Sequence, residues 1–199
     1  MAKSKTNWNT LIALLAIVVI AAIGLLTSFV PKISGAAEGN VSVTLAGAAS
    51  ITLTDSIVDF GTGTVTGDYA FLDSNSTSHE NWTVTTQGSN GWPSQTDYIV
   101  IQNNGNVNVG IQIFASKTAS DFIGSNAEQY FAGVDDSGAC ASGLARSYTT
   151  LTTTPTTLCG SLNWPPSPNS LRVAFKLKIP STASTGPKTN TITFSAYQV

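Results

Sequence analysis

The chain has 199 residues, of which 42% are hydrophobic and only 10% are charged. An average globular protein carries about 25% charged residues, and helical surfaces depend on them for solubility and helix propensity. Here Thr, Ser, Asn and Gly take their place, which disfavours an α protein. The six basic residues after residue 37 form no stripe and are outnumbered by eleven acidic residues, which disfavours nucleic-acid binding.

The first residues of the chain are predicted to direct its export. Lys3 and Lys5 precede residues 11–30, which are apolar or small and contain no charge. As a helix this run would be about 30 Å long, the thickness of the hydrocarbon core of a bilayer. Basic residues on the short N-terminal side favour retention of that end in the cytoplasm and export of the rest. The sequence therefore predicts an extracellular or cell-surface protein that uses the secretory pathway and meets the membrane only through residues 11–30.

The fate of this leader is open between three outcomes. Small residues around Ala36 and Ala37 suit cleavage by a signal peptidase. The apolar part of a signal peptide is usually only about 7–15 residues long, so a retained membrane anchor is an alternative. A third alternative is a pilin-type signal, whose helix stays and packs into a filament core. The predicted division is residues 1–37 as signal peptide or anchor and residues 38–199 as one domain.

After the leader the apolar residues alternate with a period of two, which is typical of strands. Strands are predicted over residues 41–45, 51–53, 57–60, 82–84, 98–101, 107–113, 171–179 and 192–196. An Asn-Gly pair at residues 104–105 predicts a hairpin turn. The predicted fold is all-β: a single immunoglobulin-like antiparallel β-sandwich that follows an N-terminal hydrophobic helix.

Two polar regions, residues 67–95 and 133–168, are predicted to be long loops or edge hairpins. Such segments commonly carry binding surfaces. Trp82, Trp92 and Trp164 fall in these regions and are predicted to be exposed contact residues.

Two covalent features are predicted for the exported domain. Cys140 and Cys159 are an even pair in a chain that leaves the cytoplasm, which indicates one disulfide. Asn40, Asn75 and Asn81 each begin an Asn-x-Ser/Thr tripeptide and are candidate glycosylation sites.

Catalytic chemistry is not indicated. His79 is the only histidine, and no nucleophile elbow, zinc-binding helix motif or Gly-rich phosphate loop is present. Asp135 and Asp136 do not have the spacing of a calcium loop, and turn formation is the simpler interpretation. The sequence predicts neither an enzyme nor a metal or cofactor site.

Three motifs resemble a module of small secreted archaeal surface proteins. Residues 58–61 are Val-Asp-Phe-Gly, residues 101–109 are Ile-Gln-Asn-Asn-Gly-Asn-Val-Asn-Val, and residues 186–194 are Gly-Pro-Lys-Thr-Asn-Thr-Ile-Thr-Phe. The likeness covers most of residues 41–197. Similar exported sandwiches build archaeal threads and bundling pili, in which an N-terminal strand of one subunit completes a sheet of the next. The resemblance implies a surface or filament role.

Residues 41–45 are the candidate donor strand, with Val41, Val43 and Leu45 on one face. A strand of this kind adds to an exposed sheet edge through backbone hydrogen bonds. The hypothesis is a structural subunit of an extracellular filament or cell-surface coat whose partners are copies of itself. One alternative is that residues 41–45 are simply the first strand of their own sandwich. The alternative functions are a membrane-anchored monomeric adhesin or glycan- or partner-binding module, and a type IV pilin-like subunit with a retained helix.

Overall fold

The computed structural model describes residues 47–199. The predicted leader, the cleavage residues Ala36 and Ala37, the sequon at Asn40 and the candidate donor strand lie outside the described residues. Within residues 47–199, no helix combines the length and the apolar character that crossing a membrane requires.

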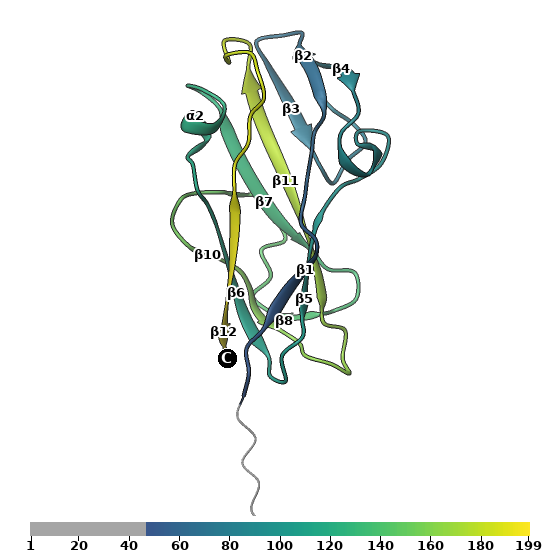
Figure 1. The fold of residues 1–199 in the computed structure, drawn as a ribbon, viewed down its shortest axis with the longest axis vertical. Coiled ribbons are helices and arrows are strands. Elements are labelled where there is room, and N and C mark those ends of the chain that lie inside the picture. The colour runs from purple at the N-terminus through teal and green to yellow at the C-terminus, as the bar shows by residue number, and fades with distance from the viewer. Residues whose placement is uncertain (1–46) are drawn as a thin grey trace, which may run out of the picture. The chain divides into compact units, whose positions relative to one another are not determined.

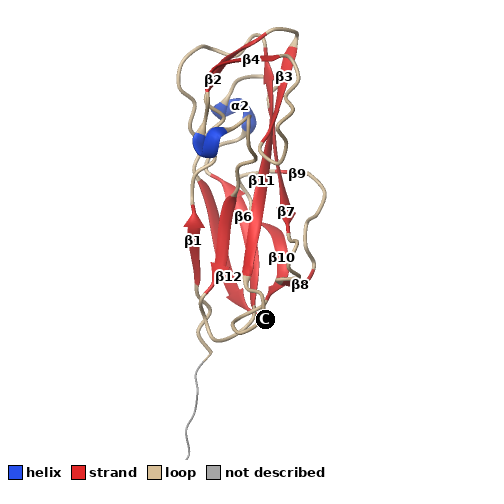
Figure 2. Cartoon of the chain, turned by 90° about the vertical axis from the view of Figure 1, so that its right-hand side faces the viewer, coloured by secondary structure: helices blue, strands red, loops and turns tan. Residues whose placement is uncertain are grey.

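Two antiparallel sheets form the framework of the described chain (Figures 1 and 2). The first has the order β1 (Ile51–Asp55), β5 (Ile99–Asn103), β11 (Ser170–Pro180), β7 (Glu128–Val134) and β9 (Thr149–Thr150), and β3 (Tyr69–Asp73) pairs with the second half of β11. The second has the order β12 (Ile192–Gln198), β6 (Val109–Ala115), β10 (Thr156–Leu162) and β8 (Cys140–Ser142). The predicted antiparallel β-sandwich is confirmed.

Smaller elements complete the described structure. A separate two-stranded sheet pairs β2 (Thr62–Val65) with β4 (Trp82–Thr86). A 3-10 turn, Ser89–Gly91, precedes β5, and the short helix α2 (Ala119–Phe122) follows β6. Helix α2 begins where the Thr118 side chain accepts a hydrogen bond from the Asp121 amide at 3.2 Å.

The core lies between the inner faces of the two large sheets. Leu171 and Val173 of β11 meet Ile111 and Ile113 of β6 there, and all four side chains are fully buried. Each such side chain contributes roughly 1.5–3 kcal/mol relative to an exposed one. Apolar and polar residues alternate in the sequence because alternate residues of a strand face the core.

The two regions predicted as long loops or edge hairpins both contain strands, and the interior strand β10 was not expected. Residues 67–95 hold β3 and β4, and residues 133–168 hold β8, β9 and β10. Strand β10 is even an interior strand of the second sheet. Its pairing with β6 shifts register twice, between Thr157 and Cys159 and between Cys159 and Leu162. These irregularities break the alternation by which strands are recognised in a sequence.

The predicted disulfide is confirmed. Cys140 and Cys159 are bonded, their Cα atoms are 6.0 Å apart, and the bond ties the outer strand β8 to β10. The two cysteines are 19 residues apart in the sequence. A crosslink that closes a loop of this length stabilises a fold by about 3 kcal/mol in the chain-entropy model, because it restricts the unfolded chain.

Asn103 joins the end of β5 to the second sheet. Its side chain is fully buried. The Nδ2 group donates to the carbonyl oxygens of Val107 at 2.9 Å, Leu162 at 3.2 Å and Asn163 at 3.1 Å, and Oδ1 accepts from the Gly105 amide at 3.0 Å. The hairpin predicted at Asn104-Gly105 does not form, because β5 and β6 belong to different sheets. The turn instead lets Asn103 hold β5, β6 and β10 together.

We predict that Asn103→Ala lowers the free energy of unfolding by about 2–3 kcal/mol, because it leaves buried carbonyl groups without donors. Urea unfolding measures this loss. Asn104→Ala is the matched control: Asn104 is the exposed neighbour, and its replacement should change stability by less than about 0.5 kcal/mol. Equal losses in the two variants would contradict the role given to Asn103.

Candidate functional site

One side of the sandwich is closed by the segment that links β8 to β10. The Ala145 amide donates to the Leu158 carbonyl of β10 at 2.9 Å, and the Ala145 carbonyl accepts from the Gly133 amide of β7 at 2.7 Å. Further along, the Leu151 amide bonds to β7 and the Thr152 carbonyl to β6, both at 2.9 Å. This segment thus supplies backbone partners to both sheets.

The opposite side is open. Among residues 47–199, β1 is an outer strand of the first sheet that pairs with β5 alone, and β12 is an outer strand of the second that pairs with β6 alone. Figure 1 shows them as the dark blue and yellow strands. Within residues 47–199, no backbone hydrogen bond joins β1 to β12. The described residues therefore supply no segment to this side equivalent to the one that closes the other side.

The hydrogen-bond register shows which backbone groups of β12 face outward. The Thr191 carbonyl accepts from the Ser116 amide at 2.8 Å, and the Val199 amide donates to the Asn108 carbonyl at 3.4 Å. In an antiparallel pair such bonds recur at every second residue, so the odd-numbered residues of β12 are bonded to β6. The N–H and C=O groups that point away from β6 belong to Ile192, Phe194, Ala196 and Gln198.

An apolar row accompanies these outward backbone groups. The side chains of Ile192, Phe194 and Ala196 pack against the core but are only half-buried. Leu53 of β1 is 40% exposed. Unpaired backbone groups beside an incompletely covered apolar row are what an added strand needs, since the backbone supplies affinity and the side chains set the register.

Strand β12 differs from the other outer strands of the two large sheets. It has seven residues, with no charge, no proline and no break in its register with β6. Strand β1 has a register shift between Leu53 and Asp55 and ends on a carboxylate, while β8 and β9 have only three and two residues. Proteins normally protect sheet edges by such shortness, bulges and charges. In the described part of the chain, β12 is the long edge without protection.

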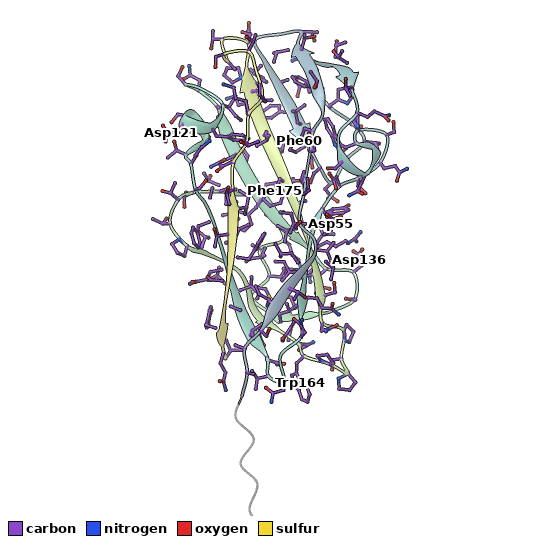
Figure 3. All side chains as sticks on the ribbon, in the orientation of Figure 1. Asp55, Phe60, Asp121, Asp136, Trp164 and Phe175 are labelled. Atoms are coloured by element: carbon purple, nitrogen blue, oxygen red, sulfur yellow. A yellow bond between two sulfur atoms is a disulfide. The ribbon has the colours of Figure 1, made fainter. Side chains whose placement is uncertain are left out.

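The predicted contact surface of three tryptophans does not form. Trp92 is fully buried, its Nε1 donates to the Asp73 carbonyl at 3.0 Å, and its ring meets Phe60 edge-on at 4.9 Å. The prediction that Trp92 is exposed was wrong, because its indole N–H has an internal partner. Trp82 is half-buried in β4, and Trp164 is 44% exposed at the other end of the molecule (Figures 1 and 3).

Both described sequons lie on the surface. Asn75 is exposed in the turn after β3, and its Oδ1 accepts from the Tyr98 hydroxyl at 2.6 Å. Asn81 is exposed in a left-handed conformation with φ of 54°, and its Nδ2 donates to the Tyr69 carbonyl at 3.1 Å. Glycosylation of either residue stays a prediction.

The Asp135 side chain stabilises the turn between β7 and β8. Within residues 47–199, no three His, Cys, Asp or Glu side chains are grouped so that they could hold a metal ion. The Asp135 carboxylate accepts from the amides of Ser137, Ala139 and Cys140 at 2.8–3.1 Å. Burial raises the pKa of Asp135, but these N–H groups outweigh it and hold that pKa below its ordinary value.

Comparisons with protein-family models, with curated proteins and with solved structures found no match to this chain. The resemblance to archaeal surface proteins therefore stays a prediction from the motifs.

We predict an alternating pattern of hydrogen exchange along β12 in monomeric protein without residues 1–46. The amides of Ile192, Phe194 and Ala196 should exchange at least tenfold faster than those of Thr193, Ser195 and Tyr197, because only the latter are bonded to β6. Exchange followed by NMR measures these rates. Uniform protection of all six amides would show that the edge is already paired.

Proposed function

We propose that this protein is a structural subunit of an extracellular filament, similar to a pilus or thread, or of a cell-surface coat. Subunits join head to tail when residues 41–45 of one copy add to the open side of the next. The observation that carries the proposal is the edge of β12, which is long, uncharged and apolar on its inner face and has no partner among the described residues. A soluble monomer with such an edge is prone to edge-to-edge association, so a partner strand is expected.

The candidate donor has the complementary pattern. Val41, Val43 and Leu45 alternate with Ser42 and Thr44, so one face of an extended segment is apolar and the other is polar. The segment contains no charge that would be desolvated on insertion. A contact between two different surfaces of the same molecule does not close on itself unless the rotation completes a ring, and so it generates filaments.

The disulfide and the surface composition support a location outside the cytoplasm. Disulfides persist in oxidising compartments, and Cys140 and Cys159 are bonded. Export through the leader and cleavage near Ala36 or Ala37 belong to the same proposal, because cleavage there would leave the donor strand close to the new N-terminus.

The test uses Ala196→Pro. The Ala196 amide points away from β6, so proline removes no bond of the sheet but blocks pairing at the outer edge. We expect a folded, exported protein and at least a tenfold loss of filaments in sheared cell-surface material under the electron microscope. Thermal unfolding of the exported protein establishes that it is folded.

Ala196→Ser is the matched control, because it keeps the amide and should keep the filaments. Deletion of residues 41–45 should give the same loss as Ala196→Pro. Normal filaments from the deletion variant would refute assembly by strand donation.

A further inference from the structure

The chain enters β1 in an extended conformation along the turn between β5 and β6. The Ala48 amide donates to Asn106 Oδ1 at 2.7 Å, and the Ala48 carbonyl accepts from the Asn106 amide at 3.3 Å. The Ser50 carbonyl accepts from the Asn104 amide at 3.1 Å. Residues 48–50 therefore continue the line of β1 beyond the end of its sheet.

Gly47 marks the end of β12 at which the chain arrives. A β-carbon placed on Gly47 would lie 3.0 Å from Gln198 Nε2 and 3.0 Å from Val107 Cγ1. Gln198 is the last residue of β12. Gly47 therefore lies beside the C-terminal end of β12 in its own molecule.

The position of Gly47 determines the direction in which residues 41–45 could pair with β12 of the same molecule. Residues 41–45 would have to reverse direction at residue 46 and run parallel to β12. Tight reversals between strands use residues with positive φ, and Gly47 is not among the glycines with positive φ. A parallel pair is also slightly less stable per residue than an antiparallel one. The local geometry disfavours this arrangement.

Residues 41–45 of a second copy would approach β12 in the opposite direction. Strand β12 runs toward the end of the molecule at which the chain enters β1. When neighbours in a stack point the same way, the N-terminal segment of one reaches the β12 of the next from the opposite end. The chain direction of that segment then opposes the direction of β12.

Building on the proposed function, we infer that residues 41–45 of a second copy pair antiparallel with β12. In this register Leu45 lies opposite Ile192, Val43 opposite Phe194 and Val41 opposite Ala196. The outward backbone groups of these three β12 residues receive the donor. The inserted strand would supply backbone hydrogen-bond partners on the open side, as the segment around Ala145 does on the closed side.

The side-chain pattern selects this register. Three apolar residues of the donor meet the three apolar residues of the inner row of β12, and Ser42 and Thr44 lie on the outer face opposite Ser195 and Thr193. A slip by one residue would turn the apolar row of the donor toward solvent. A slip by two would place an apolar residue opposite Gln198 or beyond the start of β12. Hydroxyl pairs across neighbouring strands add a small stabilisation.

Cysteine pairs in the full-length exported protein test the direction and the register. Thr44 and Thr193 would face each other at a position without hydrogen bonds between them, where Cα atoms are about 4.5 Å apart, within the range that a disulfide spans. Thr44→Cys combined with Thr193→Cys should give a ladder of covalent multimers on a non-reducing gel, and reductant should collapse it to monomer. Ser42→Cys with Ser195→Cys should give the same ladder.

The control pairs have the opposite expectation. Thr44→Cys with Tyr197→Cys matches one parallel register, and Ser42→Cys with Thr193→Cys matches another, two residues away. Each pair should give less than a tenth of the multimers formed by Thr44→Cys with Thr193→Cys. A ladder from these pairs would overturn the inferred direction.

Two other results would overturn the inference. An internal disulfide in a monomer would show that residues 41–45 pair with β12 of their own molecule. Dimers from Thr193→Cys or Ser195→Cys alone would show that β12 pairs with β12 of another copy.

Electron microscopy of the unsubstituted protein separates this inference from the proposed function. Filaments in the unsubstituted protein without a ladder from Thr44→Cys with Thr193→Cys would overturn the antiparallel register alone. Absence of filaments from the unsubstituted protein would overturn the proposed function itself.

Discussion

An open β-sheet ends on strands whose outer N–H and C=O groups bond to water or to another chain segment, and the two sides of the sandwich meet this constraint differently. On one side, Ala145 and its neighbours give backbone hydrogen bonds to both sheets. On the other, the outer backbone groups of β12 have no partner among residues 47–199, and the apolar row beside them packs against the core but is only half-buried. The core, the disulfide and the Asn103 network hold a sandwich that is complete except along this edge.

The sequence predicts the sheet class well and the position of the edge poorly. Alternation of apolar residues, as in β6 and β12, follows directly from the burial of one face and needs no knowledge of topology. Strand β10 was missed because its bulges at Cys159 and Leu162 interrupt the alternation. Trp92 was misplaced because a polar neighbourhood in the sequence does not show that its indole N–H would bond to Asp73.

The sequence indicates the candidate donor strand but not the strand that would receive it. Residues 41–45 stand out by their pattern and by their place after the leader. The receiving strand does not, because a strand becomes an edge only through the order of strands in the sheet. The signal available was the composition of β12, whose residues Ile-Thr-Phe-Ser-Ala-Tyr-Gln lack the charge or proline that protects most long edges.

Titration of isotope-labelled protein spanning residues 47–199 with a synthetic peptide of residues 38–47 tests the receiving edge most directly. The account predicts saturable NMR shifts that are largest at the amides of Ile192, Phe194 and Ala196, and at least a tenfold weaker affinity for a peptide with Val43→Pro. Absence of shifts along β12, or shifts centred on Trp164 instead, would contradict it.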